Sequence, residues 1–129
     1  MTQRIKVLLA KPTHDCHDRG VRYTARMFRD AGFEVIFITF LMADEVVATA
    51  VQEDVAVIGI SSSSGGHMPV FEDLLAGMKR AGLDDVLVIG GGVIPFADAR
   101  ELHDRGIVLF GPGSAAADAV EYVRRNIRF

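Results

Sequence analysis

The strongest constraint on the fold is a regular alternation of apolar runs with segments of helical periodicity. Runs such as Val55–Ile60 are apolar on both faces of a strand, which is typical of parallel strands buried between two helix layers. We expect five strands of this kind, at Ile5–Ala10, Glu34–Phe40, Val55–Ser61, Val86–Gly90 and Ile107–Phe110. Their short lengths and even spacing predict a parallel sheet with a helix in each connection.

The intervening segments carry apolar residues three and four positions apart, as expected for amphipathic helices. These stripes run over Val21–Ala31, Ala43–Val51, Val70–Met78, Ala99–Leu102 and Ala116–Val123. Gly32, Gly82 and Gly106 mark helix ends, and Ser114 is a candidate N-cap. Strict alternation of strand and helix implies right-handed crossovers. The sequence therefore predicts an α/β protein with one flavodoxin-like (Rossmann-like), doubly wound five-stranded parallel sheet, in strand order 2-1-3-4-5.

Size and charge exclude several classes of protein. With 129 residues, residues 1–129 form one predicted domain, since a (β/α)₈ barrel alone needs about 250. The net charge of −3 with mixed signs gives no footprint for nucleic acid or for a membrane surface. We see no signal peptide and no apolar run near the ~20 residues of a membrane span. The single cysteine, Cys16, suits a reducing compartment, so we expect a cytoplasmic protein.

Small and polar residues gather where four of the predicted strands end. The four segments are Lys11–Gly20, Ser61–His67, Gly90–Pro95 and Gly111–Ser114. In an open parallel sheet, ligands bind outside the carboxyl ends of the strands. Permissive, glycine-rich segments meeting at one edge predict a bulky ligand that approaches the backbone closely.

Asp15 and His17 are a candidate metal-binding pair in the first of these segments. A neutral imidazole binds transition metals, and a carboxylate often fixes its tautomer through the other ring nitrogen. An ordinary polar loop remains an alternative, as does a zinc site using His14 and His17, although no cluster completes one. The serine-glycine segment could be a phosphate cradle, but it lacks the P-loop pattern. His67 could be structural or could contact a ligand.

The pattern Lys-x-x-x-Asp-x-His-Asp-Arg-Gly resembles the signature of cobalamin-binding domains in acyl-CoA mutases of the methylmalonyl-CoA type. It is matched by Lys11, Asp15, His17, Asp18, Arg19 and Gly20. The resemblance implies that His17 is the lower axial ligand of cobalt. It also implies that Asp15 hydrogen-bonds the other imidazole nitrogen and that Lys11 contacts Asp15.

The resemblance continues through the later segments. It implies that the displaced dimethylbenzimidazole tail of the cofactor enters a slot between the first and third strands. Ser61 would face this tail, and Gly91 and Gly92 would let it pass beside the backbone. Ser63 stands where the family usually has leucine. Gly111 belongs to a Phe-Gly-Pro-Gly phrase typical of the acyl-CoA branch.

The resemblance implies the small, adenosylcobalamin-binding subunit of a hetero-oligomeric isomerase that rearranges the carbon skeleton of an acyl-CoA. A large catalytic subunit, expected to be a barrel, would bind the acyl-CoA, and the small subunit would be inactive alone. Methylmalonyl-CoA, isobutyryl-CoA and 2-hydroxyisobutyryl-CoA are compatible substrates, and a free-standing small subunit favours the last two. A corrinoid carrier for methyl transfer and a non-catalytic cobalamin-binding module are the alternatives. We further expect the segment Lys11–Gly20 to be mobile without ligand, so that ordering it costs about 10 kcal/mol.

Overall fold

The computed structural model describes residues 5–13, 19–62, 67–92, 96–110 and 116–127. Strands and helices alternate throughout these ranges. The strands are β1 (Lys6–Pro12), β2 (Glu34–Phe40), β3 (Val57–Ser62), β4 (Leu87–Gly92) and β5 (Val108–Phe110). The helices are α1 (Arg19–Asp30), α2 (Ala43–Glu53), α3 (His67–Ala81), α4 (Phe96–Asp104) and α5 (Ala116–Asn126).

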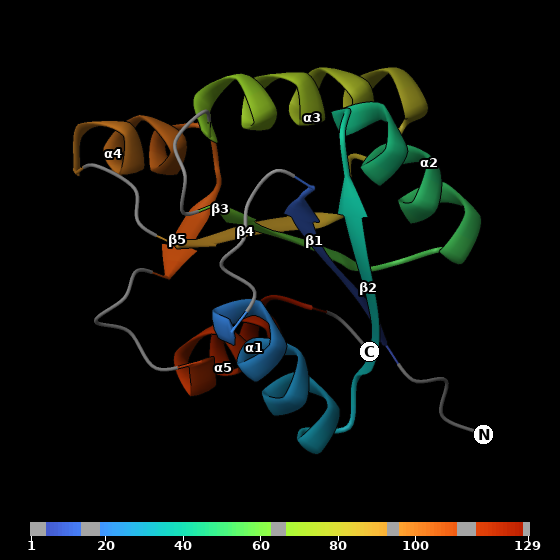
Figure 1. Ribbon diagram of the computed structural model, residues 1–129, viewed down its shortest axis with the longest axis vertical. Helices are drawn as coiled ribbons and strands as arrows, with labels where there is room; N and C mark the ends of the chain where they lie inside the picture. Colours follow the sequence, from blue (N-terminus) through green and yellow to red (C-terminus); the bar gives the residue numbers. More distant parts are fainter. Residues whose placement is uncertain (1–4, 14–18, 63–66, 93–95, 111–115, 128–129) are drawn as a thin grey trace.

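The strands form one parallel sheet in the order β2-β1-β3-β4-β5, which confirms the predicted topology. Helices α2, α3 and α4 cover one face of this sheet, and α1 and α5 cover the other (Figure 1). Among the described residues, no helix combines the length and the apolar character that crossing a bilayer would require.

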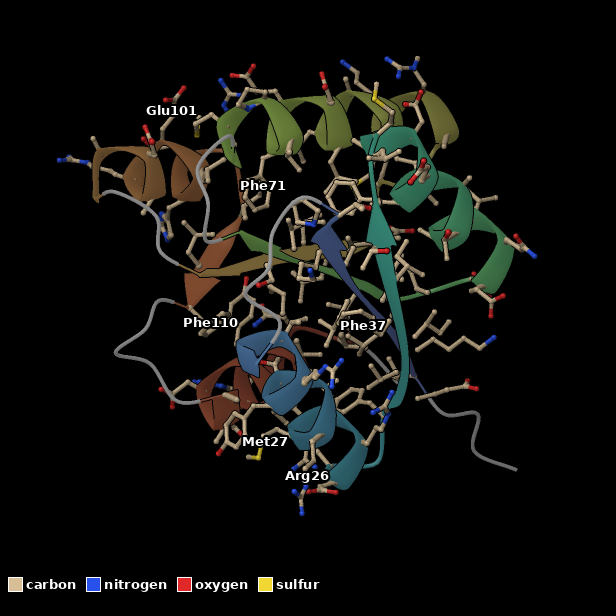
Figure 2. All side chains as sticks on the ribbon, in the orientation of Figure 1. Arg26, Met27, Phe37, Phe71, Glu101 and Phe110 are labelled. Atoms are coloured by element: carbon tan, nitrogen blue, oxygen red, sulfur yellow. The ribbon has the colours of Figure 1, made fainter. Side chains whose placement is uncertain are left out.

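Each face of the sheet has its own apolar core, because alternate residues of a strand point to opposite faces. On the α2/α3/α4 face the strands contribute Leu8, Ala10, Ile58 and Ile60, which pack with buried helix residues such as Phe71 and Leu102. On the α1/α5 face they contribute Val7, Leu9, Val57 and Ile89, which pack with Phe28 and Val123. Figure 2 shows Phe71 between α3 and the sheet, and Phe37 and Phe110 on the side of α1 and α5.

Three helices are followed by a glycine in the left-handed region, as the sequence predicted. The φ angles are +98° at Gly32, +73° at Gly82 and +91° at Gly106. Any residue with a Cβ would be strained in this conformation, so these positions favour glycine. Each of these glycines returns the chain toward the amino end of the following strand.

The predicted boundaries of the polar segment Lys11–Gly20 were wrong. Lys11 and Pro12 belong to β1, where they pair with Thr39 and Phe40 of β2. Arg19 and Gly20 already belong to α1. The expected ten-residue loop from Lys11 to Gly20 is therefore shorter at both ends. Proline is tolerated at the end of β1 because the pairing with β3 stops at Ala10 and Ile60.

The fourth strand is also longer than predicted. It includes Gly91 and Gly92, which the sequence had placed in a turn after Gly90. Their partners on β3 are Ser61 and Ser62. Glycine and serine have low strand propensity, so the extension comes from pairing with a neighbouring strand.

Candidate functional site

The last row of residues on the α1/α5 face differs from the rows beneath it. The preceding row is apolar and consists of Leu9, Gly59 and Ile89, of which Gly59 pairs with Ile89 across β3 and β4. Two residues further along each strand, and therefore on the same face, stand Lys11, Ser61 and Gly91. Ser61 pairs with Gly91, and Gly91 pairs with Phe110. The sheet thus places three of the predicted site residues side by side at its carboxyl edge.

Lys11 is a buried ammonium-bearing residue at this edge. It is 8% exposed and is the one polar or charged residue among the buried residues of the described chain. Burying an ammonium group is unfavourable unless it is paired, and Lys11 does have an interaction partner. Its strand position is held by parallel pairing with Thr39 of β2. A positive charge is therefore held at the point where the chain leaves β1.

The chain leaves β1 in a defined direction. The Thr13 N–H donates a hydrogen bond to the Phe40 carbonyl at 2.8 Å, so the pairing of β1 with β2 continues one residue past the strand. Helix α1 begins at Arg19. The segment between these two points carries Asp15, His17 and Asp18, which lie outside the described residues. Its two ends, however, are both anchored in regular structure at the carboxyl edge.

Gly91 leaves the backbone of β4 bare on the α1/α5 face. A Cβ added there would meet only the Phe110 carbonyl oxygen among the described atoms, at 3.4 Å. Gly59, one row below on the neighbouring strand, is different because an added Cβ would lie 2.6 Å from Leu9 Cδ2. Packing with its neighbours explains Gly59, whereas Gly91 leaves room for a group from outside the sheet.

Gly20, in the first turn of α1, is similarly open. It is exposed, and a Cβ built on it would meet no heavy atom of the described chain within 4 Å. Its carbonyl accepts a hydrogen bond from Thr24 Oγ1 at 3.0 Å. Neither a positive φ nor internal packing requires glycine at this position. Close approach of a ligand to the backbone would explain why Gly20 has no side chain.

The described residues fit the tail of a corrinoid cofactor. On one face of the sheet they provide a buried cation, a hydroxyl group and bare backbone above an apolar row. Flat heterocyclic groups are usually held in sites of this composition, mainly apolar with a few placed polar groups. The proposed cobalt ligand His17 and its partner Asp15 lie outside the described residues, as do Ser63 and Gly111. Within the described ranges, no group of three or more His, Cys, Asp or Glu side chains could hold a metal ion.

The two described histidines, His67 and His103, lie in the first turn of α3 and the last turn of α4. His67 begins α3, as expected, and His103 is exposed on α4. Cys16 and His14 lie outside the described residues. The sequence analysis missed the exposed pair Leu41 and Met42 at the end of β2. An apolar residue at a helix N-cap was the available signal, since polar residues are preferred there.

Comparison with known proteins identifies the family. The model of the B12 binding domain matches residues 5–121. The chain belongs to the B12-binding domain family. A second match agrees, because the chain is 45% identical over 104 residues to the 2-hydroxyisobutanoyl-CoA mutase small subunit of Aquincola tertiaricarbonis. This match covers 80% of the chain and 76% of that subunit.

Other B12-binding relatives are much longer proteins. The chain is 37% identical over 123 residues to the methylmalonyl-CoA mutase of Escherichia coli K12, and the match covers 94% of the chain but 17% of that enzyme. It thus spans about a sixth of the length of this relative. Among solved structures, a cobalamin-binding protein from Desulfitobacterium hafniense superposes with a TM-score of 0.81. The identity there is 24%, over 97% of this chain and 60% of that one, so this likeness shows the fold alone.

Proposed function

We propose that this B12-binding chain is the cofactor-carrying subunit of an adenosylcobalamin-dependent acyl-CoA mutase, and that it acts with a separate large subunit in the cytoplasm. The observation that carries the proposal is the match to the 2-hydroxyisobutanoyl-CoA mutase small subunit, which extends over most of both chains at 45% identity. Two curated relatives at 37% and 45% identity are acyl-CoA mutases, which favours this function over a corrinoid methyl carrier.

In this proposal one imidazole nitrogen of His17 would ligate the cobalt of the cofactor. Asp15 accepts a hydrogen bond from the other nitrogen, which fixes the tautomer and increases the basicity of the ligand. Lys11, a buried residue at the end of β1, would support the pair. Asp18, Arg19 and Gly20 follow His17 in the sequence, and we propose that they contact the cofactor where α1 begins.

The α1/α5 face of the sheet would hold the nucleotide tail of the cofactor at the carboxyl edge. The bare backbone at Gly91 would allow close approach, a role we propose also for Gly92, and the Ser61 hydroxyl can hydrogen-bond the tail. The apolar row of Leu9 and Ile89 suits a benzimidazole ring beneath. Ser63 and Gly111 complete the proposed set of contacts from the ends of β3 and β5.

When bound, adenosylcobalamin supplies a carbon radical by homolysis of its cobalt–carbon bond. The residues of this chain ligate and orient the cofactor, and none of them is proposed as a general acid, a general base or a nucleophile. The large subunit binds the acyl-CoA, so the separate chain has no mutase activity. We propose 2-hydroxyisobutanoyl-CoA and isobutyryl-CoA as the substrates to assay first.

Electron paramagnetic resonance of cob(II)alamin tests the proposal at its central residue. The spectrum is recorded with natural and with ¹⁵N-histidine-labelled protein, each alone and with the mutase large subunit of A. tertiaricarbonis. Nitrogen bound to cobalt splits the signal into triplets for ¹⁴N and doublets for ¹⁵N. We expect the splitting to follow the histidine label and to disappear in His17→Ala. His103→Ala, at an exposed histidine of α4, is the matched control and should retain it.

If the splitting did not change with the histidine label, the cofactor would be keeping its own base as the cobalt ligand. The proposed role of His17 would then be wrong. The splitting could follow the histidine label while the chain and the large subunit together rearrange no acyl-CoA. This outcome would contradict the mutase assignment but not the role of His17. Methyl transfer from methylcobalamin under the same conditions would favour the carrier function instead.

A further inference from the structure

Two neighbouring apolar side chains are exposed at the carboxyl edge of the sheet. Among the described large hydrophobic residues, the exposed ones are Tyr23, Leu41, Met42 and Val51. Leu41 and Met42 are consecutive and are the most exposed of the four, at 75% and 62%. They connect the end of β2 to the start of α2. Single exposed apolar residues are common, but an adjacent pair at a functional edge suggests a contact surface.

The pair lies next to the cofactor site. The residue before it, Phe40, pairs with Pro12 of β1, and the Phe40 carbonyl accepts the hydrogen bond from the Thr13 N–H. The segment that carries Asp15 and His17 starts directly after Thr13. Leu41 and Met42 are therefore at the same edge as the proposed cobalt ligand, beside the strand from which it departs.

The backbone of this pair is held in place by helix α2. The Leu41 N–H donates to Glu45 Oε2 at 3.0 Å, and the Glu45 N–H donates to the Met42 carbonyl at 3.0 Å. Met42 is the N-cap residue, and its side chain makes no capping hydrogen bond. Serine, threonine, asparagine or aspartate there would stabilise the helix. Methionine lacks this benefit, so its exposed thioether side chain has no evident role within the described part of the chain.

We propose that Leu41 and Met42 are a docking contact for the large catalytic subunit of the mutase, beside the cofactor. This inference rests on the proposed function, because a subunit that brings substrate to the cofactor must approach this edge of the sheet. A second copy of this chain seated on the pair would obstruct the same approach. Methionine and other large apolar residues are enriched in the cores of interfaces, where charged residues are depleted.

Substitution of the cap separates docking from folding. Met42→Ser removes the apolar side chain and supplies a hydroxyl that caps α2. We expect the melting temperature of the isolated chain to rise by about 2–5 °C. We also expect the affinity for the A. tertiaricarbonis mutase large subunit, measured by biolayer interferometry with cobalamin present, to fall at least about tenfold. Leu41→Ser should weaken the same complex without raising the melting temperature.

Val51→Ser is the matched control. Val51 is 53% exposed on the same helix, about 13 Å from Met42 along the helix axis, toward the opposite edge of the sheet. It should leave the affinity unchanged. Unchanged affinity of Met42→Ser and Leu41→Ser would overturn the docking inference while leaving the proposed function intact.

Other outcomes identify other occupants. If sedimentation showed the unsubstituted chain to be a dimer that Met42→Ser dissociates, the pair would bind a second copy and the inference would be wrong. If the unsubstituted chain failed to bind the large subunit although His17 ligation was observed, both the docking inference and the mutase assignment would fail. Histidine-dependent splitting of the cob(II)alamin signal should be the same in Met42→Ser, since neither the cobalt ligand nor the tail site is altered.

Discussion

Gly90 and Gly91 are neighbours on β4, yet they face two differently built sides of the sheet. A Cβ at Gly90 would fall onto Leu109 Cδ2 and lie 2.8 Å from Phe71 Cζ. Among the described atoms, a Cβ at Gly91 would meet only the Phe110 carbonyl oxygen, at 3.4 Å. On the α2/α3/α4 face, apolar packing therefore continues to this level of the sheet. On the α1/α5 face, the described residues of the central strands at this level are Lys11, Ser61 and Gly91, and apolar packing continues only at the edge, where Phe110 of β5 contacts Tyr122 of α5.

This difference shows where the fold keeps space for a ligand. The packed face carries buried residues such as Ile60 and Ala10 close to the carboxyl edge. The opposite face ends in Lys11, Ser61 and Gly91, which offer charge, a hydroxyl group and bare backbone. Adjacent positions of the same strand thus face a tightly packed core on one side and the proposed cofactor site on the other.

Alanine at Gly90 and at Gly91 should have very different effects on the free energy of unfolding. Gly90→Ala should lower the free energy of unfolding by about 2–3 kcal/mol, because the new methyl group overpacks the core between Leu109 and Phe71. Gly91→Ala should change it by less than about 0.5 kcal/mol. Urea denaturation followed by circular dichroism measures both. Equal destabilisation by the two substitutions would contradict the contrast between the faces.

A larger side chain at the open glycine should act on the cofactor. Gly91→Leu projects into the space proposed for the nucleotide tail, so we expect the affinity for cobalamin to fall about 100-fold or more. The measurement is equilibrium dialysis with the large subunit present. Circular dichroism of the variant should remain that of the folded chain. Tight binding by a folded Gly91→Leu variant would mean that the tail lies elsewhere.

A smaller effect is expected at the buried lysine. Lys11→Met keeps the length and the apolar stem of the side chain but removes its charge. We expect the affinity for cobalamin to fall about tenfold through the loss of the proposed contact with Asp15. The free energy of unfolding should change by no more than about 1 kcal/mol, because the charge lost is also one that was costly to bury. Dialysis and urea denaturation test this pair of values. A loss of stability without a loss of affinity would assign Lys11 to the fold instead of the site.

The sequence by itself determined the topology of this protein. Period-two and period-3.6 apolar patterns are local, and strict alternation of strand and helix leaves few arrangements open. Glycine at 32, 82 and 106 marked helix ends because only a residue without a Cβ adopts their positive φ easily. The sequence pattern around His17 also indicated the cofactor, and the B12-binding domain model matches residues 5–121.

Tertiary structure decided which of these residues are buried, packed or exposed. Lys11 reads as a loop residue beside Thr13 and His14, but pairing with Thr39 draws it into β1 and burial follows. Gly90 and Gly91 are the same residue type, so the sequence does not distinguish them. Side chains from α3 and β5 fill the space beside Gly90, whereas no described side chain lies within 4 Å of a Cβ built on Gly91. In the sequence Met42 is one of several scattered methionines. In the structure it follows the end of β2, which pairs with the carboxyl end of β1. In each case the deciding contact joins residues far apart in the chain, whereas propensity and periodicity describe only near neighbours.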